Sequence, residues 1–246
     1  MSASSGSAGP LDFWVRAWAF RRVPIEGIAS LRKAPASGHT FPVSLLKNAD
    51  EQTVVVLAAL MEAVDRLGAP LEAYRDWGVL GAPRFIGRDC IGQAIPEYTR
   101  EGPWSVSPHI IPHRSLHSTS GTITLALGSG GPNHGVGGGP DAETEGLLAA
   151  LAMLGERPVP GVWLTLSQVT PLTRCDSSLG RPPDGSQVEA LVLALTREGP
   201  GLALQLDSTL PIGQGAGLAC DLDSVLNLLQ QGGSLPLARV GMLRAA

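Results

Sequence analysis

The sequence has few charged residues and no cluster of basic ones. Charged residues make up 16% of the 246 residues, the formal net charge is −4, and no run of Lys or Arg is longer than Arg21-Arg22. Proteins that bind nucleic acid need many cations to neutralise phosphates. We therefore expect no nucleic-acid partner, and the sparse charge leaves surface that a protein partner could cover.

Cysteine and long apolar runs are also scarce. Cys90, Cys175 and Cys220 are scattered without C-x-x-C spacing, and their odd number argues against a disulfide framework or a structural zinc site. Every apolar stretch is interrupted before it reaches membrane-spanning length, so we expect no membrane segment. Residues 1–10 are small and polar and predict a disordered tail. Together these features predict a cytoplasmic protein with reduced thiols.

The sequence contains no metal or cofactor motif that would indicate a catalytic centre. His113, His117 and His134 lack H-x-x-x-H spacing on a helix, so we expect no metal and no cofactor. The glycines of 135–139 do not have the spacing of a phosphate-binding loop, because Pro140 interrupts it. We expect these glycines to allow close backbone approach instead.

Periodicity predicts an α/β fold, with a mixed, mostly parallel sheet and helices on both faces. We expect one domain over residues 11–232 and a weakly structured tail over 233–246. Residues 24–47 predict a long surface connection, and the last two strands predict a hairpin around Glu198-Gly199-Pro200. The expected strands are 11–20, 77–81, 162–169, 188–196 and 202–206. The first expected helix is 48–68 and is capped by Asn48. The second is 140–154, with Pro140 in its first turn, and a third is opened by Asp221 and Asp223.

Four segments, in order, resemble the N-terminal half of the β-ketoacyl synthases, the decarboxylating condensing enzymes of fatty-acid and polyketide assembly. Residues 48–68 resemble the first long helix with its D-x-Q start, and 77–81 resemble the strand that follows it. Gly131-Pro132 onward resembles the strand that leads to the active-site cysteine, and 181–193 resemble the R-P-F-D…G-E-G-A-x-x-L-V-L block. The resemblance implies a thiolase-type fold of which this chain has one N-terminal-type half.

The same resemblance implies that the catalytic cysteine is absent. Counting from Gly131-Pro132 places Pro140 at the position of the nucleophile, and proline has neither a thiol nor the backbone N–H that helps to stabilise the oxyanion in ketosynthases. The acids Asp141, Glu143 and Glu145 then open the helix and would repel an anionic intermediate. The family's histidine motifs, H-G-T-G-T and G-H, are also missing. We expect no catalytic residue and no independent enzymatic activity.

Among the condensing enzymes, the chain resembles short ketosynthase-like proteins that act as chain-length-factor partners in aryl-polyene-type systems. His117-Ser118-Thr119-Ser120-Gly121 resembles their H-N-x-x-x-G element, with Ser118 in place of Asn. The resemblance implies a heterodimer with an active β-ketoacyl synthase, and an acyl-carrier protein as a further candidate partner. The candidate pocket residues around the vestigial position Pro140 are His134, Gly138, Gly139 and Asp141. The expected dimer interface is the strand formed by Asn133, His134, Gly135, Val136, Gly137 and Gly138.

Two alternatives stay open on the sequence alone. One is a homodimeric scaffold that binds an acyl chain or a carrier protein. The other is a thioesterase-like enzyme with relocated chemistry, in which His134 and Asp141 would cooperate.

Overall fold

The fold was obtained as a computed structural model, which describes residues 11–35, 38–156, 158–171, 185–207, 220–237 and 241–245. The expected tail 1–10 lies outside these residues, and so do residues 181–184 of the ketosynthase-like block 181–193. The strands are β1 Leu11–Pro24, β2 Gly78–Pro83, β3 Asn133–Gly135, β4 Val162–Thr170, β5 Gln187–Thr196, β6 Leu202–Asp207, β7 Ser234–Leu237 and β8 Gly241–Ala245. The helices are α1 Ile28–Lys33, α2 Val43–Lys47, α3 Glu51–Leu67, α4 Arg88–Glu101, α5 Ile110–Arg114, α6 Leu116–Leu127, α7 Ala142–Glu156 and α8 Leu222–Gln231.

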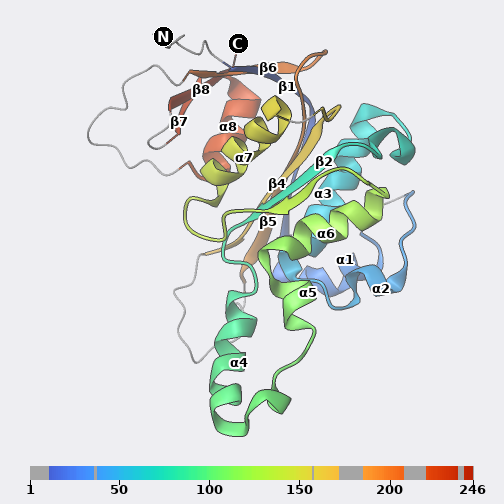
Figure 1. Cartoon of the computed structure of the whole chain (residues 1–246), viewed down its shortest axis with the longest axis vertical. Helices are drawn as coiled ribbons and strands as arrows, with labels where there is room; N and C mark the ends of the chain where they lie inside the picture. The colour runs from blue at the N-terminus through green and yellow to red at the C-terminus, as the bar shows by residue number, and fades with distance from the viewer. Residues whose placement is uncertain are drawn as a thin grey trace, which may run out of the picture.

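The described strands form one eight-stranded sheet in the order β3-β2-β4-β5-β1-β6-β8-β7 (Figure 1). The sheet is mixed, as expected, but it is mostly antiparallel. Parallel pairing is confined to β2 with β3 and β2 with β4, whereas the other five pairings are antiparallel. The alternation of β and α segments along the sequence predicts a parallel sheet only if each helix connects neighbouring strands. Here α3 connects β1 to β2, which are not neighbours in the sheet.

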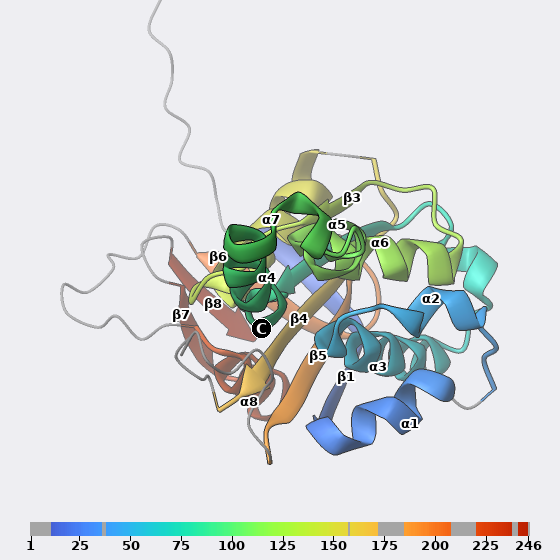
Figure 2. The ribbon, with the colours of Figure 1, turned by 90° about the horizontal axis from the view of Figure 1, so that it is seen from below.

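Helices cover both faces of the sheet, as the sequence predicted (Figure 2). On one face, α3 packs against β1 and β5 and is itself covered by α1 and α6. On the other face, α7 lies over β2 and β4, and α8 lies near β7 and β8. Each face has its own apolar core. Because α3 lies between the sheet and two further helices, it is buried nearly all round rather than on one face only.

The predicted start of α3 was wrong by two residues. The helix begins at Glu51, and its N-cap is Asp50, whose side chain accepts a hydrogen bond from the backbone N–H of Gln52 at 2.9 Å. Asn48 takes no part in this cap. The predicted end is confirmed, because Gly68 closes the helix with a φ of 67°. Residues 24–47, expected as a surface connection, contain the short helices α1 and α2.

The predicted hairpin between β5 and β6 was also wrong. Both strands exist, but β1 lies between them and pairs with both, so the connection crosses the end of β1. Gly201, with a φ of 138°, makes this crossing possible, because a Cβ there would overlap the carbonyl oxygen of Val15.

The C-terminal region is ordered into the sheet rather than forming the weakly structured tail expected over 233–246. Strands β7 and β8 pair with each other, and β8 pairs with β6. Leu243 of β8 is fully buried, which ties this segment into the core on the α7 and α8 side.

Candidate functional site

The turn around Pro140 joins the short strand β3 to helix α7, where the sequence placed the vestigial active site. Pro140 is exposed and precedes the first helical residue by two positions, so it does not lie in the first turn of α7 as expected. Gly138 forms a parallel bridge with Arg84 just after β2, and the backbone N–H of Phe85 donates to the carbonyl of Gly138 at 3.3 Å. The turn is thus fixed against the end of the neighbouring strand.

Arg84 holds this turn from inside the protein. Its Nη2 donates to the carbonyl oxygen of Pro140 at 2.5 Å and to Glu143 Oε2 at 2.8 Å. The side chains of Arg84 and Glu143 are 8% and 1% exposed, so this ion pair is buried. The guanidinium of Arg84 and the carboxylate of Glu143 therefore fill the space beneath Pro140 and bind to each other.

The same contact belongs to a row of polar side chains that crosses four neighbouring strands. Gln168 on β4 lies 3.5 Å from Arg84 Nη1 and donates to Glu189 on β5 at 2.8 Å. Glu189 in turn accepts from Arg22 on β1 at 2.5 Å. Each buried charge in this row therefore has a partner of opposite charge, as the low dielectric constant of the interior requires.

Burial sets the protonation of the groups beside the start of α7. It raises the pKa of Glu143 to about 7, although Arg84 pulls in the opposite direction. Burial also raises the pKa of Cys220 to about 12, with a further contribution from nearby Glu143, so this thiol is protonated at neutral pH. A protonated, buried thiol is a poor nucleophile. The structure therefore gives no support to Cys220 as a nucleophile.

The glycines before Pro140 allow close backbone approach, as expected. A Cβ on Gly135 would overlap the carbonyl oxygen of Leu116 at the start of α6, and a Cβ on Gly138 would lie 2.6 Å from the Leu116 side chain. In contrast, a Cβ on Gly139 would have no atom within 4 Å. Two of the glycines thus let α6 pack tightly beside β3.

The other candidate pocket residues do not converge on one site. His134 is exposed and, with Val136, lines a shallow pocket of about 220 Å³ between β3 and α7, whereas Gly138, Gly139 and Asp141 do not line it. Among the described residues, no hydrogen bond or ion pair joins His134 to Asp141. The pairing required by the thioesterase-like alternative is therefore not formed in this structure.

The expected interface strand lies at an edge of the sheet. Strand β3 pairs with β2 on one side and is the first strand in the sheet order, so its other side faces no described strand. The Oδ1 atom of Asn133 is buried and has no hydrogen-bond partner among the described atoms. An unpaired strand edge can accept a strand from another molecule. Whether residues 133–138 form an interface stays a prediction.

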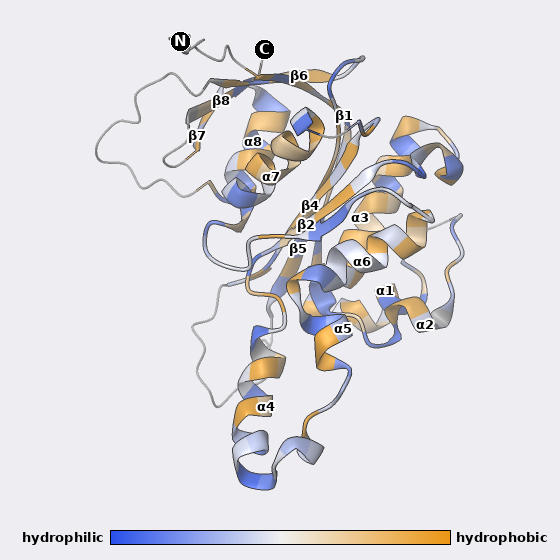
Figure 3. Cartoon of the chain, in the orientation of Figure 1, coloured by the Kyte–Doolittle hydropathy of each residue, from blue (hydrophilic) through white to orange (hydrophobic). Residues whose placement is uncertain are grey.

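Exposed apolar side chains gather on the segment that follows β2. Among the described residues, seven of the eight exposed large hydrophobic side chains lie between residues 91 and 125. The segment includes α4, which projects away from the sheet, together with α5 and α6 (Figures 1 and 3). Trp104 is 97% exposed. We call this surface the apolar arm; its members are Ile91, Ile95, Tyr98, Trp104, Ile111, Leu116 and Leu125.

A larger cavity, which the sequence analysis did not predict, lies at the base of α4. Its volume is about 440 Å³, within the range of ligand pockets. The acidic residues of its wall, Asp50 and Glu51, belong to the segment 48–68, which the sequence predicts only as a helix with a D-x-Q start. We call it the α4 cavity; its walls include Ile25, Ile28, Ala29, Arg32, Asp50, Glu51, Gln52, Phe85, Gly87, Arg88, Cys90, Gln93, Arg114 and Val169.

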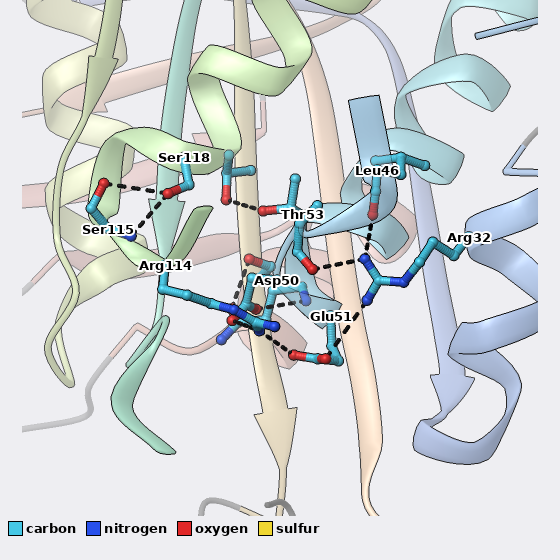
Figure 4. A network of polar contacts seen from close by, with 12 residues as sticks. Arg32, Leu46, Asp50, Glu51, Thr53, Arg114, Ser115 and Ser118 are labelled. Atoms are coloured by element: carbon cyan, nitrogen blue, oxygen red, sulfur yellow. Dashed lines mark hydrogen bonds and ion pairs between the residues drawn. The ribbon is translucent and has the colours of Figure 1, made fainter. Parts of the chain in front are cut away.

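A network of ion pairs forms the polar wall of the α4 cavity (Figure 4). Arg114 Nη1 donates to Asp50 Oδ2 at 2.9 Å and to Glu51 Oε2 at 2.7 Å. Arg32 donates to the carbonyls of Leu46 and Ala49 and lies 3.7 Å from Glu51. Burial raises the pKa of Asp50, and Glu51 raises it further, whereas Arg114 lowers it.

The described residues contain neither a cluster of three or more metal-ligating side chains nor a membrane-spanning helix. Within these residues, no group of three or more His, Cys, Asp or Glu side chains is arranged to hold a metal ion. No helix of the described chain combines the length and the apolar character needed to cross a membrane. Cys90 and Cys220 are free thiols.

No protein-family model matches the sequence, and no curated protein matches it. Solved structures do match the fold. A chain of the ketosynthase ApeO in complex with its chain length factor ApeC, from Xenorhabdus doucetiae, has a TM-score of 0.59 at 13% identity; the match covers 96% of this chain and 100% of that one. The ishigamide ketosynthase/chain length factor gives a TM-score of 0.51 at 15% identity and covers 81% and 66%.

A third match is a type II polyketide synthase acyl-carrier protein in complex with its ketosynthase, with a TM-score of 0.54 at 14% identity, covering 75% of this chain and 62% of that one. The chain thus spans less than two thirds of the chain that it matches in the acyl-carrier protein–ketosynthase complex. It spans the full length of the chain that it matches in the ApeO–ApeC complex. At 13–15% identity these matches establish the fold and nothing finer. The chain has the thiolase-type fold of the ketosynthases.

Proposed function

We propose that this chain is a catalytically inactive, ketosynthase-like subunit that pairs with an active β-ketoacyl synthase, in the manner of a chain length factor. The pathway would be a type II fatty-acid or polyketide system of the aryl-polyene kind. Two of the structures that share its fold are described as ketosynthases with their chain length factors. The free thiols Cys90 and Cys220 fit a cytoplasmic location for this pairing.

The apolar arm is the observation that carries the proposal. Exposed apolar surface on a monomeric protein often marks a binding site, and seven of the eight exposed large hydrophobic side chains among the described residues lie on this one segment. The arm also continues into the edge of the sheet, because Leu116 is 36% exposed and its backbone packs against Gly135 of β3. One partner could therefore cover the arm together with the strand edge, and the interface that the sequence predicts at residues 133–138 includes this strand edge.

The chemistry around Pro140 supports a non-catalytic role. Proline offers no nucleophile, and it has no backbone N–H to stabilise an oxyanion. The guanidinium of Arg84 and the carboxylate of Glu143 are bound to each other beneath the turn. What the fold retains at this position is a rigid junction between β2, β3 and α7.

Co-purification tests the pairing. The chain would be co-expressed with a type II β-ketoacyl synthase from the same organism, and the mixture would be examined by size-exclusion chromatography. We expect a heterodimer that is lost, or weakened at least tenfold, in Ile95→Asp, since burying an unpaired carboxylate in an apolar interface costs well over 1.4 kcal/mol. Leu11→Asp is the matched control, because Leu11 and Ile95 are 56% and 62% exposed but only Ile95 belongs to the arm. Absence of a complex with the unmodified chain would sink the proposal.

The second candidate is a homodimeric scaffold, favoured by the same exposed surface. In that case the chain would dimerise without a ketosynthase, and Ile95→Asp would make it monomeric. Analytical ultracentrifugation of the chain alone distinguishes the two, because the heterodimer proposal requires self-association to be weaker than pairing. An acyl-carrier protein is a further proposed partner in either case.

A further inference from the structure

We propose that His109 and His113 form a binding site for a divalent transition-metal ion of the class that favours imidazole ligands, such as Zn²⁺, Ni²⁺ or Cu²⁺. His109 is the N-cap residue of α5 and His113 lies within this helix. The expectation of no metal rested on His113, His117 and His134 and did not include His109. The site is formed by this chain alone and therefore does not depend on the proposed pairing.

The two histidines are four residues apart on one helical turn. His109 has helical backbone angles, with a φ of −76° and a ψ of −9°, and the backbone N–H of His113 donates to the carbonyl of His109 at 3.2 Å. Residues at positions i and i+4 of a helix lie on the same face, one above the other. Two histidines of metalloproteases bind one zinc ion from one helix with this same spacing.

The two imidazole rings lie side by side. Their centroids are 5.8 Å apart, and the angle between the ring planes is 39°. Because a bond from zinc to a histidine nitrogen is about 2.0–2.1 Å long, two nitrogens that bind one ion lie about 3 Å apart. Rings at the observed separation can each bring one nitrogen to such a position by small rotations about the side-chain bonds.

Both rings are available to a ligand. Within the part of the chain that the structure describes, no hydrogen bond or ion pair involves a ring nitrogen of His109 or His113. His109 is exposed and His113 is half-buried, so an ion can reach the pair from solvent. Burial and the neighbouring charges of His109 and Arg114 lower the pKa of His113, which favours the neutral ring that binds metal.

The rest of the protein holds this helical turn in place. Arg114, next to His113, donates to Asp50 and Glu51 at the start of α3. The carbonyl oxygen of Arg114 also lies close to Gly87, where a Cβ would be only 2.1 Å from it. These contacts tie α5 to α3 and to the loop before α4. Binding then has to order little of the backbone, which otherwise costs free energy.

The type of ligand atom selects the class of ion. Imidazole nitrogen suits zinc, copper and nickel, whereas magnesium and calcium prefer oxygen ligands. No group of three or more candidate ligands is found among the described residues. The pair therefore supplies two ligands, and water or a donor atom of another molecule completes the coordination of the ion.

Isothermal titration calorimetry of the untagged full chain with NiCl₂ tests the site. We expect saturable binding with a stoichiometry near one. The affinity should be at least tenfold lower in His109→Ala and in His113→Ala, because each variant retains only one imidazole of the pair. MgCl₂ is expected to give no saturable binding. Absence of saturable nickel binding by the unmodified chain, or equal binding of magnesium, would overturn the proposal.

His117→Ala is the matched control. His117 follows His113 by the same four residues, but the helix is interrupted between them at Ser115, whose φ of −99° and ψ of 167° are those of an extended residue. The spacing therefore does not place these two rings on one helical face. We expect the nickel affinity of this variant to equal that of the unmodified chain. An equal loss in His117→Ala and His113→Ala would show that the helical turn is not the binding site.

Chemical modification locates the ion without any substitution. Diethyl pyrocarbonate acylates a neutral imidazole nitrogen, and a nitrogen bound to a metal ion is blocked. Saturating NiCl₂ should slow the modification of His109 and His113 at least fivefold, measured by mass spectrometry of the tryptic peptide 101–114, which contains no other histidine. The rate at the exposed His134 should not change. Equal protection of His134, or an unchanged rate at the pair, would place the ion elsewhere and contradict the proposal.

Discussion

At the scale of single residues, the site predicted from the sequence contains a contact that the sequence could not predict. Counting from Gly131-Pro132 located the turn at Pro140, because a glycine-rich strand followed by an acidic helix start leaves a recognisable pattern. The partner of that turn, Arg84, lies 56 residues away in the sequence. No periodicity relates the two positions, since only the parallel pairing of β2 with β3 brings them together.

Glu143 should make the stability of the protein depend on pH. Burial raises its pKa from 4.5 to about 7, so the folded chain binds more protons than the unfolded chain between these values. The free energy of unfolding should therefore fall as the pH rises through this range, by up to about 3 kcal/mol from this residue. Glu143→Gln removes the titrating group and should lose much less stability between about pH 5 and about pH 8.

Urea denaturation of both proteins at the two pH values measures this difference. Glu145→Gln is the matched control, because Glu145 lies on the same helical turn but is exposed. If the wild type and Glu143→Gln lose stability equally as the pH rises, the buried carboxyl is not the source of the pH dependence.

At the scale of helices and strands, the sequence was sufficient to predict elements with a strong apolar periodicity. The predictions were wrong where contacts between elements determine the type or the neighbours of a segment. The apolar positions of α3 and its terminal Gly68 were sufficient to locate that helix. Residues 122–127 are a short apolar run, which by itself does not distinguish a helix from a strand, and in the structure they form the second half of α6. The structure explains the choice of a helix, since Thr119 bonds with Thr53 on α3 at 2.9 Å and both side chains are buried.

Local sequence patterns also could not predict the order of the strands, because that order depends on contacts between elements. Alternating apolar residues indicate that β5 and β6 are strands but do not name their neighbours. A short connection favours a hairpin, yet β1 takes the place between the two strands. The C-terminal strands β7 and β8 were missed because they are four and five residues long and include Pro236 and Gly241.

The packing of α6 against β3 should depend on the absence of a side chain at Gly135. In Gly135→Ala the new Cβ would overlap the backbone of Leu116 and lie 2.7 Å from the backbone nitrogen of His117, and backbone atoms cannot move aside as a flexible side chain can. We expect the variant to be destabilised by about 2 kcal/mol. Gly139→Ala, where a Cβ would meet no atom within 4 Å, should unfold at the same denaturant concentration as the wild type or slightly above it.

Thermal or urea unfolding of the two variants gives the comparison directly. A loss of similar size in both would indicate that the glycine run is needed for its backbone conformation in general, and not for the approach of α6 to β3.

At the scale of the whole molecule, the distribution of apolar and charged surface predicts how the chain should associate. The formal net charge is only −4, and the exposed hydrophobic side chains are concentrated on the apolar arm. An association driven by burial of apolar surface is almost insensitive to salt, whereas one driven by charge weakens as ions screen it. The two kinds of partner interface can therefore be separated by ionic strength.

We expect the dissociation constant of the ketosynthase complex to change less than about threefold when NaCl is raised from about 0.1 M to about 1 M. The heat-capacity change of binding should be negative, because apolar surface is removed from water. Isothermal titration calorimetry at two salt concentrations and several temperatures measures both quantities. A dissociation constant that rises tenfold or more with salt would show that charged residues outside the arm dominate the interface, and the assignment of the arm as the docking surface would then be wrong.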